Sequence, residues 1–195
     1  MTQAQQERLR AAELPAGSVV SVLLEQHAKI RELFEQTAQA RGEARLSAFD
    51  ELRELLAVHE AGEEIVVRPV TKHAFGGQIA DARNHEEKQA ASALAQLEKL
   101  EVESHEFTEM FAAFERDVSD HADAEEGGEF SYILSTVDPQ QQLTMGNRLL
   151  EVQRIAPTHP HPTAAGSPAA QKVIGPFAAL LDKARDAFNN TTTGN

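Results

Sequence analysis

Histidines and glutamates recur on the apolar faces of the segments that the sequence predicts to be helices. In these segments the apolar residues follow the three- and four-residue spacing of an amphipathic α-helix. An imidazole or a carboxylate is costly to bury in such a face unless another group compensates it. Several of these groups, converging from different helices, are what a cation in the core of a helical bundle requires. The polar residues on these faces are His27, His59, Glu63, His85, His121 and Glu125.

The periodic segments predict an all-α fold built on four long helices of similar length. We expect these helices at about residues 18–40, 45–68 and 78–100, and from residue 104 onward. Pro69 is expected to end the second helix, because proline cannot continue a helix interior. A strand is the rival interpretation of the short apolar run at 64–70, but helical spacing covers the same residues. Helices of about 20 residues are about 30 Å long, so these four can pack side by side.

The helical segments divide the chain into a bundle and two flanking regions. Residues 1–17 are expected to form a flexible N-terminus, and residues 18–155 the four-helix bundle. Pro139 opens a helical stretch, which is either a kinked continuation of the fourth helix or a separate fifth helix. Residues 156–195 combine a linker that contains proline and histidine with a final amphipathic helix at about 173–188.

Composition excludes several classes of partner and of metal site. The formal net charge of −13 argues against nucleic acid and an anionic membrane as partners. The chain contains no cysteine, which excludes thiolate zinc sites and iron–sulfur clusters. The polar N-terminus lacks the apolar region of a signal peptide, and no apolar run approaches the roughly 18 residues of a membrane span. We therefore expect a cytoplasmic protein; its oligomeric state stays open, and a monomer fits the sequence.

The position of each histidine on its helix carries more information than its spacing from a glutamate. Residues four apart lie about 40° from each other around a helix, so His-x-x-x-Glu places both groups on one face. That spacing arises easily by chance, because 31 of the 195 residues are acidic. His105 and Glu109 have the same spacing, yet they lie about 160° around the helix from Phe107, on the polar side. His121 lies only about 20° from Phe114, on the apolar side.

A metal site explains these groups better than isolated core histidines do. Without a metal, Glu63 and Glu125 would be buried carboxylates with no buried lysine or arginine to match them, which is costly. Imidazole and carboxylate ligands suit iron, manganese or zinc, and two glutamates from different helices can bridge two ions. Glu60, which directly follows His59, is a further candidate ligand or else a residue of the solvated face. The other acids near these motifs are expected on solvated faces, namely Glu64, Glu86, Glu87 and Glu126.

These motifs resemble those of the hemerythrin HHE cation-binding family. The matching pieces are H-A-K-I-R-E-L-F, H-E-A-G-E-E, N-H-E-E-K and H-A-D-A-E-E, in the family's order over about residues 18–135. The resemblance implies an up-down-up-down four-helix bundle, here with an additional C-terminal helical segment. It also implies a non-heme centre of two oxo- or hydroxo-bridged iron ions, for which zinc or manganese can substitute in preparations. In such a centre the terminal ligands would be His27, His59, His85 and His121, and the bridging carboxylates Glu63 and Glu125.

The chain departs from the oxygen-carrying members of the family at the third helix. Those members have a second histidine four residues from the helix-three histidine, where this chain has Asp81 and Gln89. Some HHE proteins use the acid directly after the helix-two histidine as an extra ligand, and Glu60 occupies that position. An anionic oxygen in place of an imidazole should favour ferric iron and weaken reversible oxygen binding. Gly127 and Gly128 after the fourth motif either loosen that helix and open a route to the metals or mark an ordinary break.

Three further histidines and one tyrosine are expected to lie outside the ligand set. His73 is expected in a loop between the second and third helices. His159 and His161 are expected in an extended segment between prolines, in a tail that resembles that of actinobacterial HHE proteins. Tyr132 shares the face of Glu125; core packing is its expected role, ahead of a hydrogen bond to the site or direct ligation.

Three functions are compatible with such a site. One is an oxidoreductase of the di-iron peroxidase or catalase kind, which reacts with hydrogen peroxide or other small oxidants and protects against oxidative stress. The second is a protein that binds, stores or senses oxygen, nitric oxide or iron without turnover. The third is a structural bundle that a metal stabilises. A fold by itself does not choose among them; the missing histidine favours the first, with small molecules as partners.

Overall fold

The computed structural model describes residues 1–155 and 177–192. Within these ranges, the side chains of residues 73–85, 87, 155, 177–178 and 190–192 are not described. The elements of the described ranges are all helical, which confirms the predicted all-α fold. The run at 64–70 is helical as well, so the rival strand interpretation is wrong. Among the described residues, no helix combines the length and the apolarity that crossing a membrane requires.

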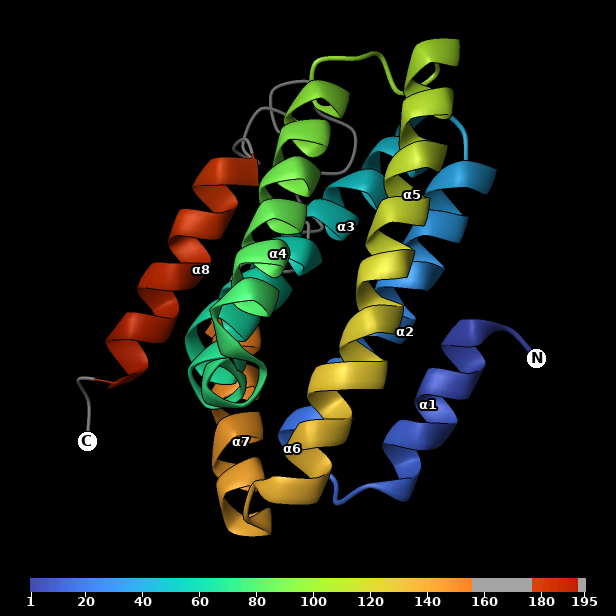
Figure 1. Cartoon of the computed structure of the whole chain (residues 1–195). Coiled ribbons are helices and arrows are strands. Elements are labelled where there is room, and N and C mark those ends of the chain that lie inside the picture. Colours follow the sequence, from blue (N-terminus) through green and yellow to red (C-terminus); the bar gives the residue numbers. More distant parts are fainter. Residues whose placement is uncertain (156–176, 193–195) are drawn as a thin grey trace.

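Four long helices form the centre of the molecule. They are α2 (Val19–Gln39), α3 (Gly42–Gly62), α4 (Arg68–Leu97) and α5 (His105–Glu125). Figure 1 shows that the chain reverses direction from each of these helices to the next, which gives the predicted up-down-up-down arrangement. The start of α5 follows the prediction closely, because the Ser104 hydroxyl accepts a hydrogen bond from the backbone N–H of Phe107 at 3.0 Å.

Two of the long helices continue through a π-helical turn that begins at, or directly after, a candidate glutamate. The turn η1 (Glu63–Val67) follows α3, and the turn η2 (Glu126–Phe130) follows α5. Such turns hold one residue more than an α-helical turn and are frequent at functional sites. The sequence predicted that Pro69 ends a helix, and this prediction was wrong. Pro69 lies in the first turn of α4, where a missing backbone N–H costs little. The backbone of His73 accordingly lies in α4 rather than in a loop, and its side chain is outside the described part.

The glycines after the fourth motif neither end the helix nor bend it into a loop. Gly127 and Gly128 lie within η2, which leads directly into α6 (Ser131–Thr136). Val137 then adopts an extended conformation, and Pro139 begins the separate helix α7 (Pro139–Ile155). The stretch from Pro139 is therefore a further helix and not a kinked continuation of the fourth.

The N-terminal segment is helical, whereas the sequence suggested a flexible region over residues 1–17. Helix α1 (Gln3–Glu13) begins with a capping box, in which the Thr2 and Gln5 side chains each bond the other's backbone N–H. It packs along α2 with Ala4 and Ala11 buried. The prediction was wrong because the helix is too polar to show a clear apolar face and depends on contacts with α2. Figure 1 shows α1 alongside the lower half of α5 as well.

The last described helix, α8 (Phe177–Thr192), packs against α3 and carries the buried Leu180, Ala184 and Phe188. It corresponds to the C-terminal helix expected at about 173–188. The linker that contains His159 and His161 lies outside the described residues.

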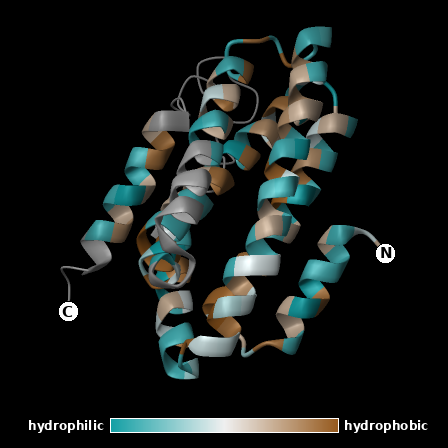
Figure 2. Ribbon diagram, in the orientation of Figure 1, coloured by the Kyte–Doolittle hydropathy of each residue, from teal (hydrophilic) through white to brown (hydrophobic). Residues whose placement is uncertain are grey.

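Two apolar clusters stabilise the bundle, one at each end of the long helices. The lower cluster joins the first half of α2 to η1, α6, α7 and α8, and the upper cluster joins the second half of α2 to α3 and α5. His27 lies between Leu24 of the lower cluster and Ile30 of the upper one, so the candidate metal site separates the two. In Figure 2 the hydrophobic colour is concentrated where the helices face one another. The candidate ligands are therefore surrounded by apolar layers on both sides.

Candidate metal centre

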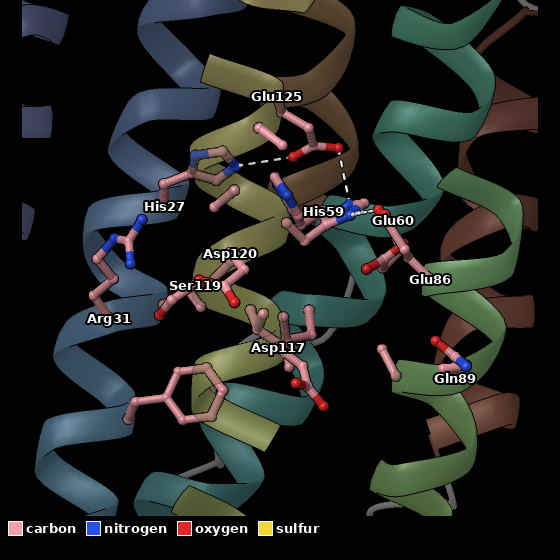
Figure 3. A pocket seen from close by; sticks show the side chains of 18 residues that line it. His27, Arg31, His59, Glu60, Glu86, Gln89, Asp117, Ser119, Asp120 and Glu125 are labelled. Carbon is pink, nitrogen blue, oxygen red and sulfur yellow. Dashed lines mark hydrogen bonds and ion pairs between the residues drawn. The ribbon is translucent and has the colours of Figure 1, made fainter. Parts of the chain in front are cut away.

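Four of the predicted ligands meet in the core of the bundle. His27 comes from α2, His59 from α3, Glu63 from the first position of η1 and Glu125 from the last position of α5. One ligand atom of each lies within 4.8 Å of the corresponding atoms of the other three, and the residues are only 2–4% exposed. Figure 3 shows His27 and His59 turned toward Glu125. The sequence prediction thus placed residues from three helices at one point.

His121 extends the cluster along α5. Its Nε2 lies 2.9 Å from Glu125 Oε1, while Nε2 of His27 lies 3.6 Å from Glu125 Oε2 on the other side. Glu125 therefore sits between two imidazoles from different helices. On the α3 side, His59 Nε2 lies 3.5 Å from Glu63 Oε1. The carboxylate of Glu125 thus connects the His27 side of the centre to the His121 side.

The candidate ligands His27, His59 and His121 share one orientation: Nδ1 points outward to a polar partner, and Nε2 points inward. Nδ1 of His27 bonds Glu126 Oε1 at 2.9 Å, and Nδ1 of His121 bonds Glu86 Oε2 at 2.9 Å. A carboxylate oxygen accepts, so each Nδ1 carries the hydrogen. Metal-binding histidines are held in this way, because the outer hydrogen bond fixes the tautomer and the ring orientation.

His59 follows the same rule with an uncharged partner. Its Nδ1 bonds the amide oxygen of Gln26 at 3.0 Å. Burial and the neighbouring His27 lower the pKa of His59 to about 3, so the ring is neutral and its Nε2 lone pair is available at any ordinary pH.

The other two histidines favour the charged state because acids surround them. Burial alone would lower the pKa of His121, but the hydrogen bonds to Glu125 and Glu86 and the charge of Glu60 raise it to about 10. Burial would also lower the pKa of His27, but the nearby carboxylate of Glu125 and the hydrogen bond to Glu126 raise this pKa above its ordinary value. In the metal-free protein, the positive charge of the His121 ring therefore takes part of the role that a cation would have, and the neighbouring acids favour the charged form of His27 as well.

The two central glutamates are in opposite electrostatic states. Burial raises the pKa of Glu63 well above its usual value, and the carboxylates of Glu125, Glu60 and Glu129 raise it further. Burial would also raise the pKa of Glu125, but hydrogen bonds and charges from His121 and His27 hold it well below its usual value. A bound cation would stabilise the ionised form of Glu63, which burial and the neighbouring carboxylates disfavour.

The donor atoms at the centre fit a bound metal. Three buried side-chain atoms at the centre have no hydrogen-bond partner, although buried polar atoms usually have one. The atoms are His27 Nε2, Glu63 Oε2 and Glu125 Oε2. Imidazole nitrogen and carboxylate oxygen are ligands that suit iron, manganese and zinc, so the residues present agree with the metal chemistry that the sequence predicts.

A cavity of about 280 Å³ opens beside this cluster between α2, α3, α4 and α5. His59, Glu60, His121 and Glu125 line its inner part, and Ile30, Phe34, Leu56 and Val118 form an apolar wall. Toward the outside it is acidic, with Glu86, Asp117 and Asp120 in view in Figure 3. The volume exceeds by far the roughly 30 Å³ that one water molecule occupies in the liquid, so small molecules have room next to the ligands.

The remaining predicted residues have different outcomes. Glu60 lines the cavity and raises the pKa of Glu63 and His121, but it is not among the four atoms of the tightest cluster. The backbone of His85 lies in α4, whereas its side chain is outside the described part. Tyr132 packs against the lower apolar cluster, as expected of a core residue. His105 was expected on the polar side, and its side chain is 84% exposed.

Sequence reasoning missed the outer partners of the histidines. Glu126 and Glu86 were expected on solvated faces, yet they bond His27 and His121, and Glu126 is only 8% exposed. Gln26 and the buried Glu129 received no role at all. A helical pattern shows which side of its own helix a residue occupies, but not which neighbour covers a position at the edge of that face. The signal available for Glu126 was its place next to Glu125.

Comparison with known proteins agrees with this centre. Residues 18–133 match the Hemerythrin HHE cation binding domain. The chain belongs to the hemerythrin HHE cation-binding family. The matched residues contain all of the predicted ligands, and the family confirms the resemblance found in the sequence motifs.

Two relatives extend this comparison. An uncharacterized hemerythrin-like protein of Schizosaccharomyces pombe is 28% identical over 134 residues, which make up 67% of this chain and 66% of the yeast protein. The chain thus matches slightly less than two thirds of that relative's length. A crystal structure of a hemerythrin HHE cation-binding domain-containing protein from Mycobacterium kansasii superimposes with a TM-score of 0.66. That match covers 85% of this chain and 98% of the other at 20% identity, so it supports the shared fold.

Proposed function

We propose that this protein is a non-heme di-iron protein that reacts with hydrogen peroxide or other small oxidants. The observation that carries the proposal is the buried group of His27, His59, Glu63 and Glu125, whose ligand atoms lie within 4.8 Å of one another beside a cavity. A metal that only stabilised the bundle would need a closed ligand shell without such access. The cavity therefore favours chemistry over a purely structural role.

The proposed ligands are of two kinds, terminal and bridging. His27, His59, His85 and His121 would be terminal ligands, and Glu63 and Glu125 would join the two ions. Two iron ions alternating between the ferrous and ferric states would supply the electrons for reduction of an oxidant. Zinc or manganese could occupy the same donors.

The chain's own residues prepare the site for this chemistry. Gln26, Glu126 and Glu86 hold three imidazole rings so that Nε2 points inward. The apolar clusters on both sides exclude bulk water from the donors. Glu60 lies where the cavity reaches His59 and His121, so its carboxylate is placed to hold a proton or a ligand position next to an entering oxidant.

A binding protein without turnover is the alternative. The apolar wall formed by Ile30, Phe34, Leu56 and Val118 suits a neutral diatomic gas such as oxygen or nitric oxide. The same site could also store or sense iron. These functions need the same ligands, so they differ from the oxidant reaction only in what happens after a small molecule enters.

Metal analysis of protein purified without chelator is the test, together with the ultraviolet and visible spectrum before and after hydrogen peroxide. We expect about two irons per chain and oxo-bridge charge-transfer bands that change with peroxide. Two irons that do not respond to peroxide would favour gas or iron binding. A folded chain that takes up neither iron, manganese nor zinc would contradict the metal-site proposal.

A further inference from the structure

The N-terminal helix α1 reaches the metal centre through a chain of polar contacts. We propose that Arg10 is a positioning residue for His27, which it holds through Glu126, so that α1 is a functional part of the site. The inference rests on the proposed metal-binding function of His27. Arg10 lies outside the 18–133 segment that matches the family domain.

Glu126 connects the arginine to the imidazole with its two oxygens. Oε2 accepts from Nη1 of Arg10, and Oε1 accepts from Nδ1 of His27 at 2.9 Å. The carboxylate is 8% exposed, so water competes little for either oxygen. Charge-assisted bonds of this kind are stronger than neutral ones. Because Glu126 has both oxygens engaged, the position of Arg10 influences the hydrogen bond that orients the His27 ring.

Helix α1 is held over this place by further ion pairs. Glu7, which is almost fully buried, accepts from Arg31 at 2.5 Å, and Arg31 also donates to Asp123 at 2.7 Å. Arg8 pairs with Glu32, the residue of α2 that follows Arg31, at 2.9 Å. The Ser21 hydroxyl donates to the backbone carbonyl of Ala11, whose side chain is in the lower apolar cluster. The helix is therefore fixed at several points, and Arg10 is aimed at Glu126.

The same atoms could be taken for a second cation site, because ligand atoms of Glu7, His27 and Glu126 lie within 4.8 Å of one another. Arg31 and Arg10 already supply cationic partners to the two carboxylates. These two ion pairs offset the charges of Glu7 and Glu126, so we assign the cluster to positioning rather than to a second metal.

The relay has a defined effect on a metal held by His27. An outer carboxylate raises the basicity of a ligating imidazole and fixes its tautomer. Arg10 offsets part of the negative charge of Glu126 and keeps the carboxylate against the ring. Loss of the arginine charge should stabilise the ferric state, whereas loss of the carboxylate charge should stabilise the ferrous state. Arg10→Gln and Glu126→Gln are therefore expected to shift the reduction potential in opposite directions.

The chain offers a matched control on the same helix. Arg8→Gln removes ion pairs that hold α1 against Glu25 and Glu32, but it leaves Arg10 and Glu126 in place. Arg10→Lys keeps a positive donor and should restore much of the wild-type behaviour, because a single contact joins Arg10 to Glu126. These two variants separate the docking of α1 from the positioning of His27.

Three readouts test the proposal on the full chain. In metal-free protein, at a pH high enough to keep the His27 ring neutral, nitrogen NMR of His27 reports whether Nδ1 carries the hydrogen. In iron-loaded protein, the reduction potential and the rate of iron release to a chelator report on the bound metal. We expect Arg10→Gln to loosen the tautomer preference, to lower the potential and to speed iron release by about 10-fold, the lower limit for outer partners of metal ligands. Arg10→Lys and Arg8→Gln should stay close to wild type in all three.

Equal changes in Arg10→Gln and Arg8→Gln would overturn the inference, since α1 would then act only by covering the bundle. No change in potential or tautomer in Arg10→Gln would also overturn it. If the wild-type chain bound no iron, the proposed function would fail, and the NMR comparison of the metal-free variants would still decide whether Arg10 holds His27.

Discussion

Helices α3 and α5 carry the same pattern of histidine and paired acids and end in the same way. Residues 59–64 read H-E-A-G-E-E, and residues 121–126 read H-A-D-A-E-E. In each case a π-helical turn begins at the first or second of the paired acids. The two motifs nevertheless have opposite electrostatics, because different residues surround them.

The partners of the histidines account for the first difference. Nδ1 of His59 faces an amide, and the ring is neutral; Nδ1 of His121 faces a carboxylate, and the ring is protonated in the metal-free protein. The pKa values of the two glutamates differ as well. The pKa of Glu125 is lowered by the imidazoles on either side of it, whereas the pKa of Glu63 is raised by burial and by other carboxylates. A motif thus sets where a ligand lies, and its neighbours set the charge.

The last acid of each motif shows a second difference. Glu126 is buried and connects Arg10 of α1 to His27, whereas Glu64 is exposed and pairs with Arg185 of α8 at 2.8 Å. Both flanking helices therefore supply an arginine to an equivalent position. Only the α1 contact continues to a metal ligand, which is why we assign a role to α1 and not to α8.

The largest expected effect comes from removing the histidine of either motif. His59→Ala and His121→Ala should each lose roughly half or more of the bound metal, because each removes a ligand. The iron-to-protein ratio after purification measures this loss. His105→Ala is the control, since this histidine has the same spacing to an acid but is exposed. Full metal content in both ligand variants would contradict the assignment.

Opposite changes of stability should follow from neutralising the two glutamates in metal-free protein at pH 7. Glu63→Gln removes a carboxylate whose folded-state pKa is raised, and should stabilise the fold by about 1 kcal/mol or more. Glu125→Gln breaks buried ion pairs with His121 and His27, and should destabilise it by about 3 kcal/mol. Urea unfolding measures both. Changes of the same sign would mean that the motifs are electrostatically alike.

A titration of metal-free protein should separate the two histidines. The folded-state pKa of His121 is about 10, above its ordinary 6.5, so its contribution to stability is complete below pH 6.5 and is lost as the pH rises toward 10. The pKa of His59 is about 3, so its neutral burial costs stability as the pH falls from 6.5 toward 3. NMR should find His121 charged at pH 8 and His59 neutral at pH 5. Titration of both rings near 6.5 would refute this difference.

The smallest expected effect concerns the position after each histidine, where α3 has Glu60 and α5 has Ala122. Glu60→Ala makes the motifs alike at this position and should leave much of the iron bound while changing the rate of reaction with peroxide. Stopped-flow absorption of iron-loaded protein measures that rate. Glu64→Ala alters an exposed acid of the same motif and should leave the rate unchanged. An unchanged rate in Glu60→Ala would return Glu60 to the solvated face.

The sequence by itself determined the all-α fold, the four long helices and the positions of His27, His59, Glu63, His121 and Glu125 at their centre. Each of these follows from local geometry, because about 3.6 residues per turn decides which side of a helix a residue occupies. The family followed from the same residues and their order. The sequence predictions were wrong where contacts with other parts of the chain prevail over a local rule. Pro69 was predicted to end a helix and lies in a first helical turn, and the predicted flexible N-terminus forms α1, which packs on α2.

Only the tertiary structure decided what surrounds the ligands. Arg10 and Glu126 are 116 residues apart in the chain, yet their contact connects α1 to His27. The same holds for Gln26 beside His59 and Glu86 beside His121. Such contacts depend on how helices rotate and slide against one another, and periodicity within a single helix contains no record of that. The charge of each group at the centre depends on these contacts, so the electrostatics of the site became visible only in the folded protein.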